Sequence, residues 1–341
     1  MKHLFAILLT IGLLTGCSEP PHSANTYQVY VFGTLVDITV WGGESSQEEK
    51  AVAAITQDFQ RMHYEWHAWK PGPLVDINKA LAAGEYAPVI SSLIPIIEQS
   101  IVLSRQSEGL FDPAIGGLLN LWGFQSDGRP NGPPPDKAEV AKWVEAAPRM
   151  SDLKLEGEVL RSSNRAVQLD FGAFAKGYAV DLAIARLREY GIENGIINAG
   201  GDLRAIGSKD GKPWRVGIRH PQGEGVLAAL EVSGDESVFT SGNYERYREH
   251  EGVRYNHILD PRTGMPVDGV TSVTVIHDNG AVADAAATAL VVAGPNAWHR
   301  IARQMGIKYV MLVDDKGVVY MNPRMQQRVQ FQETPPADIR I

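Results

Sequence analysis

The sequence predicts an α+β fold, a single domain in which helices pack on mixed, largely antiparallel sheets. Segments with helical spacing are interleaved with segments rich in β-branched and aromatic residues. Several strand segments are joined by short turns that contain glycine, which is typical of hairpins and therefore of antiparallel pairing. No linker divides the chain after residue 27, so residues 27–330 are expected to form one domain, followed by a short tail, residues 331–341.

The helices are predicted from apolar residues that recur every three or four positions. In residues 48–66, the side chains of Val52, Ile55, Phe59 and Met62 share one face. The same reasoning predicts helices over residues 91–107, 136–146, 175–190 (closed by Gly191) and 282–293.

The strands are predicted from alternating or β-branched runs bounded by turn residues. Residues 28–41 are expected to form strands around Gly33, and the Gly/Pro-rich residues 125–136 a loop. The remaining strands are expected at 152–155 and 159–161 (a hairpin), 167–170, 196–198, 203–206, 214–218, 227–232, 270–276 and 309–321, the last a hairpin that turns at 314–317.

The composition excludes several classes of protein. The 341 residues include 32 Lys and Arg against 40 Asp and Glu, a net charge of −8. A nucleic-acid-binding protein would carry a basic field, so no nucleic-acid partner is expected. A single cysteine allows neither an internal disulfide framework nor a cysteine-based zinc site.

That cysteine, Cys17, follows a segment typical of export signals. Lys2 precedes an apolar run, residues 4–14, that is too short for a stable membrane span. The run ends in Leu-Thr-Gly-Cys, which resembles the lipobox of bacterial lipoproteins. The resemblance implies a signal peptide at residues 1–16, a lipid on Cys17, a tether at residues 17–26, and anchoring to a cell-envelope membrane facing the periplasm. Ser18 favours the outer membrane by analogy, and a plain secretory signal with an incidental cysteine is the alternative.

Residues 170–177, Asp-Phe-Gly-Ala-Phe-Ala-Lys-Gly, join an expected strand to an expected helix. The backbone N–H groups and the dipole at a helix start favour anions. Lys176, in the first helical turn, does not suit the helix dipole but is well placed to meet a phosphate. An ordinary turn with a solvated lysine is an equally good interpretation of this stretch alone.

A second stretch places Asp284 and Thr288 four residues apart, on one face of the helix expected at residues 282–293. A carboxylate and a hydroxyl are hard oxygen ligands that suit Mg²⁺. Taken alone, an aspartate facing the helix dipole and a threonine bonded to a backbone carbonyl are the simpler interpretation.

A third stretch, residues 257–264, forms a turn rich in Pro and Gly that presents His257, a candidate general base near neutral pH. By itself, a structural or solvated histidine is the simpler interpretation. Two further glycine turns, residues 198–202 and 240–244, would let the backbone approach a ligand. No G-x-G-x-x-G motif follows a strand and no P-loop motif occurs.

Taken together and in order, these blocks resemble the ApbE family, the FAD:protein FMN transferases. The blocks are DFGAFAKGYAVD, NAGGD, TSGNYER, HILDPRTG and ADAAATAL, and the resemblance runs from about Val31 to Tyr320. It implies that FAD is the substrate, contacted by Asp170, Lys176, Ile258 and the segment Leu110, Phe111 and Asp112. It also implies a Mg²⁺ site made by the carbonyl of Ala173 with Asp284 and Thr288, beside Ala287, and His257 as the base for an acceptor hydroxyl.

Two departures from the family pattern affect expected FAD contacts. Phe32 precedes Gly-Thr where the family often has methionine, so an aromatic ring takes the place of a thioether. Trp69 keeps a stacking ring at the start of the loop expected at residues 69–78, but the serines of the family run are missing there.

The resemblance implies that FMN passes from FAD to a Thr or Ser of an acceptor protein, expected to be an exported or membrane redox subunit, with release of AMP. Mg²⁺-dependent hydrolysis of FAD would use the same site. A lipid-anchored flavin-binding protein without activity is a third possibility, and a structural lipoprotein without a ligand would leave the glycine turns and the Asp284–Thr288 pair unexplained.

His63 and His67 lie four residues apart on an expected helix, as a metal pair could. The H-E-x-x-H order is absent because Tyr64 follows His63, and no third ligand is evident in the sequence. They are interpreted as ordinary histidines at the end of a helix.

Overall fold

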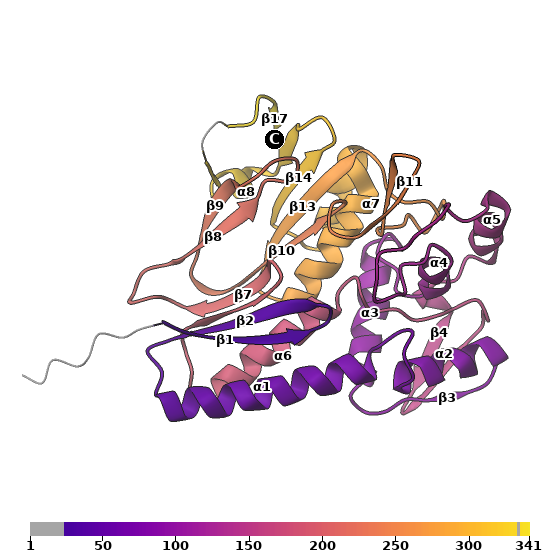
Figure 1. Cartoon of the computed structure of the whole chain (residues 1–341), viewed down its shortest axis with the longest axis horizontal. Coiled ribbons are helices and arrows are strands. Elements are labelled where there is room, and N and C mark those ends of the chain that lie inside the picture. Colours follow the sequence, from indigo (N-terminus) through magenta and orange to yellow (C-terminus); the bar gives the residue numbers. More distant parts are fainter. Residues whose placement is uncertain (1–23, 333–334) are drawn as a thin grey trace, which may run out of the picture.

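Nine strands form the central sheet of the computed structural model, which describes residues 24–332 and 335–341 (Figure 1). Their order is β1-β2-β6-β7-β10-β13-β14-β15-β17, and every neighbouring pair is antiparallel except β15 with β17. This confirms the mixed, largely antiparallel α+β architecture. Smaller sheets are formed by β16-β9-β8, by β3-β5-β4 and by the hairpin β11-β12.

The strands are β1 (Ala24–Val31), β2 (Thr34–Trp41), β3 (Ala87–Pro88), β4 (Leu153–Glu156), β5 (Val159–Ser162), β6 (Gly195–Ala199), β7 (Asp202–Gly207), β8 (Trp214–Arg219), β9 (Val226–Val232), β10 (Gly234–Gly242), β11 (Tyr247–His250), β12 (Val253–Asn256), β13 (Val270–His277), β14 (Tyr309–Asp314), β15 (Val319–Met321), β16 (Gln330–Phe331) and β17 (Ile339–Arg340). The helices are α1 (Ser45–Glu65), α2 (Pro73–Ala83), α3 (Ile94–Gln106), α4 (Gly116–Leu121), α5 (Lys137–Ala146), α6 (Ala175–Glu189), α7 (Gly280–Gln304) and α8 (Pro323–Gln326), with a 3₁₀ turn at Met150–Asp152. None of the helices in the described part of the chain combines the length and apolarity that a bilayer-spanning helix needs.

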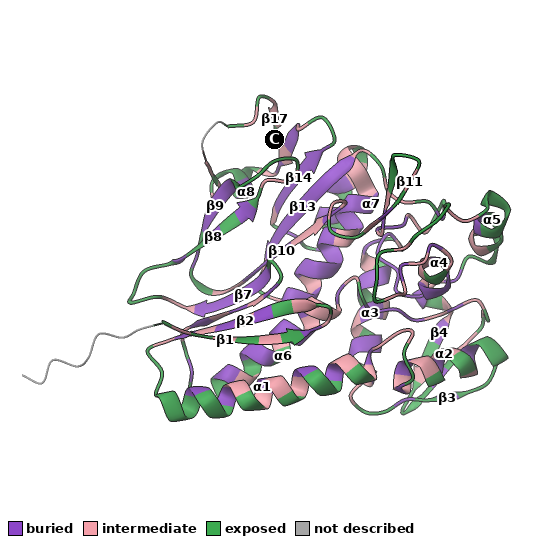
Figure 2. Cartoon of the chain, in the orientation of Figure 1, coloured by how far each residue is buried: buried purple, intermediate pink, exposed green. Residues whose placement is uncertain are grey.

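Helices α1, α6 and α7 lie along one face of the sheet (Figure 1). The apolar face of α1 that the spacing predicts is the buried one, with Ile55, Phe59 and Met62 in the core. Helix α7 is the most deeply buried helix, because small side chains on several of its sides let it lie against both β10 and β13 (Figure 2). It continues to Gln304, beyond the expected end at residue 293, through a kink at Gly294 and Pro295.

Helices α6 and α7 begin in close contact, and this contact builds the site. A Cβ added to Gly177 would lie 2.2 Å from the carbonyl oxygen of Gly280, so only glycine permits the approach. The N–H of Gly177 donates to Asp284 on α7 at 2.9 Å. The carboxylate of Asp181 on α6 accepts from the N–H groups of Gly280 and Ala281 at 2.8 and 3.1 Å, which caps the start of α7.

Replacing Gly177 by alanine is expected to lower the free energy of unfolding by about 1–3 kcal/mol, because backbone atoms must move to admit the methyl group. Gly128→Ala is the control, since a Cβ there meets nothing within 4 Å. Urea unfolding of both variants measures the difference. Equal stability of the two variants would contradict the tight α6–α7 contact.

Several expectations need correction. Residues 167–170 do not form a strand: Gln168 makes one isolated bridge, to Ile115, because only the short segment 113–116 runs alongside before the chain turns into α6. The segment expected as a loop at residues 69–78 becomes helical at Pro73, whose fixed φ suits the first turn of α2. The strands β10, β11 and β12 were not predicted, and the turn expected at residues 240–244 begins as the end of β10.

The ends of the chain differ from the expected domain limits. Residues 24–26 of the expected tether belong to β1, and the expected tail supplies Phe331 to β16 and all of β17. The predicted signal peptide and Cys17 lie outside the described residues.

Candidate active site

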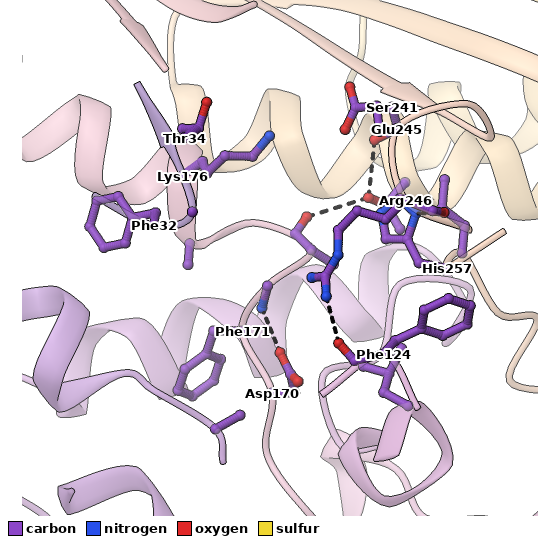
Figure 3. A pocket seen from close by; sticks show the side chains of 18 of the residues that line it. Phe32, Thr34, Phe124, Asp170, Phe171, Lys176, Ser241, Glu245, Arg246 and His257 are labelled. Atoms are coloured by element: carbon purple, nitrogen blue, oxygen red, sulfur yellow. Dashed lines mark hydrogen bonds between the residues drawn. The ribbon is translucent and has the colours of Figure 1, made fainter. Parts of the chain in front are cut away.

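A cleft of about 860 Å³ opens where the β1–β2 hairpin, the starts of α6 and α7, and two loop regions meet. Figure 3 shows Phe32 at one side of this cleft and His257 at the other. The loop regions that complete its wall are residues 110–130 and 240–259. The predicted site residues that line it are Phe32, Trp69, Leu110, Phe111, Asp112, Asp170, Ala173, Lys176, His257, Ile258, Asp284 and Thr288. Ala287 is fully buried in α7 and does not line the cleft.

Three oxygen donors predicted as metal ligands line the cleft: two come from α7, and the third is a backbone carbonyl in the turn before α6. The hydroxyl of Thr288 lies 3.4 Å from the carbonyl oxygen of Ala173, in the turn before α6, and 3.2 Å from Oγ of Ser241 on β10. Asp284 lies one helical turn before Thr288, and among the described residues only its Oδ2 has a hydrogen-bond donor, the N–H of Gly177. Burial and the nearby carboxylate of Asp202 raise the pKa of Asp284 well above its ordinary value. A buried carboxylate beside neutral oxygens fits a divalent cation such as Mg²⁺, which would stabilise its charge.

Lys176 reaches the cleft from the first turn of α6 and pairs with Asp202 at the start of β7. Burial lowers the pKa of Lys176, but the carboxylates of Asp202, Asp284 and Glu245 outweigh it and raise this pKa above its ordinary value. The lysine is therefore cationic at neutral pH. Asp202 is held in turn by the N–H of Thr240 at 2.9 Å. The positive charge that the sequence predicts in the first turn of α6 is therefore the ammonium group of Lys176, held in an ion pair with Asp202 and not free in solvent.

His257 is held as a neutral imidazole with one free nitrogen. Its Nδ1 lies 3.1 Å from the carbonyl oxygen of Arg246. A carbonyl only accepts, so Nδ1 carries the proton and Nε2 is left as an acceptor. Burial, with a contribution from the positive charge of Arg246, lowers the pKa of His257 to about 4. The ring also packs edge-on against Phe124, at 6.3 Å between centroids.

Arg246 lies beside His257 and links it to a neighbouring loop. Its guanidinium donates to the carbonyl oxygen of Phe124 at 2.7 Å, which ties the loop at 123–136 to the segment before β11 (Figure 3). The same loop is tied to the turn before α6, since Gln125 donates to Asp170 at 2.8 Å. Asp170 also accepts from the N–H of Gly172 at 2.9 Å, so this carboxylate orders the turn that presents Ala173.

Aromatic rings line the side of the cleft at the β1–β2 turn. Phe32 lies parallel to Trp66, with 6.2 Å between ring centroids, and edge-on to His63. His67 packs against Trp69 at 4.4 Å. These rings provide a surface on which a flat ring system can stack.

The two histidines interpreted as ordinary helix-end residues lie in this aromatic wall, a role that the sequence analysis missed. Their rings are 5.2 Å apart, and His67 lies just beyond the end of α1. The Nδ1 of His67 accepts from the N–H of Lys70 at 3.2 Å, which occupies that lone pair. Within the described ranges, no further His, Cys, Asp or Glu joins them in a metal-binding group.

The segment 110–112 is buried and lines the cleft, as does the buried Ile258. The carboxylate of Asp112 is bonded within the protein, to Oγ of Ser104 and to the N–H groups of Ala114 and Met150, at 3.0 to 3.1 Å. Burial raises the pKa of Asp112 to about 6. Through these hydrogen bonds, Asp112 orders the loop that carries Leu110 and Phe111.

The polar residues that line the cleft and that sequence reasoning missed include Thr34, Asp202, Ser241, Glu245 and Arg246. Four of them stand inside blocks that the sequence analysis had singled out, NAGGD and TSGNYER. The signal was therefore present, but nothing in those blocks alone shows that Asp202 faces Lys176.

The cleft combines a ring-lined wall, a helix start with a cationic lysine, and a set of oxygen donors. These features are those of the class of proteins that bind nucleotide-like ligands. Comparison with known proteins agrees with this class. The profile of the ApbE family matches residues 32–311, so the chain belongs to the ApbE family.

Relatives with known activity cover nearly all of the chain. The FAD:protein FMN transferase of Rhodobacter capsulatus is 45% identical over 327 residues, which are 96% of this chain and 62% of the relative's length. The enzyme of the same name from Vibrio cholerae is 31% identical over 318 residues, 92% of this chain and 94% of the relative.

Solved structures show the same fold. The ApbE protein of Thermotoga maritima superposes with a TM-score of 0.81 at 30% identity, covering 91% of this chain and 100% of that one. The apo flavinyl transferase ApbE of Pseudomonas stutzeri gives a TM-score of 0.78 at 29% identity, covering 90% and 97%.

Proposed function

We propose that this protein is an FAD:protein FMN transferase, which moves the FMN half of FAD to a Thr or Ser hydroxyl of an acceptor protein and releases AMP. One observation carries the proposal: the neutral His257 lines the same cleft as the oxygen donors of Ala173, Asp284 and Thr288. The two relatives of known activity support it.

Each residue has a role that follows from its geometry. The rings of Phe32, Trp66 and Trp69 offer a stacking surface for the aromatic part of FAD. Lys176, fixed by Asp202, would place a positive charge beside the diphosphate of bound FAD. Ala173, Asp284 and Thr288 would hold Mg²⁺, which when bound neutralises charge on the diphosphate oxygens.

The reaction needs one proton to be taken from the acceptor. The hydroxyl oxygen of Thr or Ser attacks the phosphorus on the FMN side, and its proton passes to Nε2 of His257. A P–O bond forms to the acceptor, the P–O bond to the adenylate phosphate breaks, and AMP leaves with the bridging oxygen. The neutral, pre-oriented imidazole is ready for this step without a change of protonation.

The test is to incubate the purified protein with FAD, MgCl₂ and exported redox subunits as acceptors. AMP is measured by chromatography and protein-bound flavin by in-gel fluorescence. The proposal requires AMP and protein-bound FMN in equal amounts. AMP with free FMN would identify a hydrolase instead, and absence of AMP would identify a flavin-binding protein.

We also propose that the protein is anchored through a lipid on Cys17 in the bacterial cell envelope, facing the periplasm. The support is the apolar run at residues 4–14 followed by Leu-Thr-Gly-Cys. Cys17→Ser is expected to lose metabolic labelling with palmitate and to move from the membrane to the soluble fraction. Membrane retention of the unlabelled variant would contradict lipid anchoring.

A further inference from the structure

Strand β1 is one end of the nine-stranded sheet, and its outer side has no partner strand among the described residues. The strand is eight residues long, Ala24–Val31, and pairs with β2 along its whole length. An edge of this length is long enough for another chain to add as a further strand.

The turn that ends β1 determines which backbone groups point outward. Phe32 and Gly33 both have positive φ, 53° and 73°, and form a two-residue turn between Val31 and Thr34. In such a hairpin the pair beside the turn exchanges both backbone hydrogen bonds, and such pairs recur at every second residue. The N–H and C=O groups of the alternate residues therefore face the free edge. These residues are Ala24, Thr26, Gln28 and Tyr30, whose side chains are all exposed (Figure 2).

This edge lacks the features that usually prevent pairing between chains. The sequence of β1, ANTYQVYV, contains no charged residue and no proline. The opposite edge of the same sheet, β17, has two residues, and one of them, Arg340, pairs with Asp338 at 2.8 Å. The edge strand β8 of a smaller sheet carries Arg215 and Arg219 and an irregular register at its end. β1 thus stands out as a long, uncharged and open edge.

The free edge runs directly into the cleft. Tyr30, 76% exposed, lines the cleft, and its cross-strand neighbour Leu35 is 44% exposed. Phe32, Gly33 and Thr34 follow and also line the cleft. A segment paired along β1 would pass this apolar pair and bring one of its ends into the cleft, in either strand direction.

We propose that an extended, uncharged segment of the acceptor protein pairs with the free edge of β1 and thereby guides its Thr or Ser into the cleft. This inference rests on the proposed function, because that function requires an acceptor segment to enter. Recognition is through backbone hydrogen bonds, with Tyr30 and Leu35 giving a preference for an apolar side chain beside the cleft. An acceptor is favoured over a second copy of this chain because the edge leads into the cleft, which an acceptor needs and a contact between copies does not.

The test removes one backbone N–H group that points to the free edge of β1, that of residue 28. Gln28→Pro lacks the N–H that faces the free edge, and proline is tolerated at such positions of an edge strand. Gln28→Ala is the matched control: both variants lose the side-chain bond to Asp37, but alanine keeps the N–H. With an exported redox subunit that the wild type flavinylates, Gln28→Pro is expected to raise KM for that subunit at least tenfold at unchanged kcat. Gln28→Ala should stay within twofold of wild type, and FAD titrations should give the same affinity for all three proteins.

The outcomes separate this inference from the proposed function. Equal KM for wild type and Gln28→Pro overturns the docking site alone, whereas absence of transfer by the wild type overturns the function. If Gln28→Pro melts far below wild type, hydrogen exchange of the full wild-type chain decides. Protection of the Thr26, Gln28 and Tyr30 amides by the acceptor supports the site, and unchanged exchange overturns it. Sedimentation showing a wild-type dimer that Gln28→Pro disrupts would assign the edge to a second copy and overturn the inference.

Discussion

Replacing Asp284 by asparagine is expected to lower FMN transfer at least 10³-fold, about 4 kcal/mol of transition-state stabilisation. The amide oxygen can still accept from Gly177, so the α6–α7 contact is kept. What disappears is the negative charge that a cation beside Ala173 and Thr288 requires. Because a neutral amide replaces a carboxylate whose pKa burial raises, the variant should unfold with a free energy equal to or above that of wild type.

Two measurements distinguish loss of the cation from loss of structure. With FAD present, Mg²⁺ should raise the melting temperature of wild type but not of Asp284→Asn. Asp314→Asn is the matched control, since Asp314 is equally buried (5% exposed for both) and bonded to backbone N–H groups, but lies outside the cleft. It should retain transfer. Full transfer by Asp284→Asn with Mg²⁺ present would remove the metal role from this residue.

Replacing His257 by alanine is expected to lower transfer to the acceptor by about 10²- to 10⁴-fold, the range for loss of a general base. The affinity for FAD should change little, because the proposed role of the ring is to take a proton from the acceptor and not to hold FAD. His299→Ala, a histidine outside the cleft, is the control and should match wild type. AMP release and in-gel flavin fluorescence measure the loss.

The pH profile makes this prediction specific. The base acts when neutral, and burial lowers the pKa of His257 to about 4. In wild type, with Mg²⁺ at saturation so that Asp284 stays ionised, kcat/KM for the acceptor should therefore stay level from pH 8 to about pH 5 and decline only as the pH falls towards 4. A histidine with the ordinary pKa of about 6.5 would already have lost about tenfold by pH 5.5. An inflection near pH 4 that persists in His257→Ala would assign the base to another group.

The largest elements were predictable from the sequence because their signals are local. The spacing of Ile55, Phe59 and Met62 marks the buried face of α1, and the alternation around Gly33 marks the β1–β2 hairpin. The expected strand at residues 167–170 was wrong because a strand needs a neighbour along its length, and only a short segment runs beside Gln168. The strand β10 was missed because its polar start, Gly-Asp-Glu-Ser, carries no alternation, although pairing with β7 and β13 makes it central.

The site, like the fold, could be predicted from the sequence only in part. The sequence by itself determined the candidate residues: the helical spacing of Asp284 and Thr288, the turn before Lys176, and the histidine before a Pro/Gly turn. Only the tertiary structure decided how they act together. The contact at Gly177 and Gly280 brings the carbonyl of Ala173 to Thr288, Asp202 arrives from β7 to hold Lys176, and Arg246 selects the tautomer of His257. Each of these contacts joins residues far apart in the chain or depends on a backbone carbonyl. The spacing of residues in a sequence shows which side chains share a face of one helix or strand. It does not show which elements pack together, so contacts between distant elements could not be predicted from it.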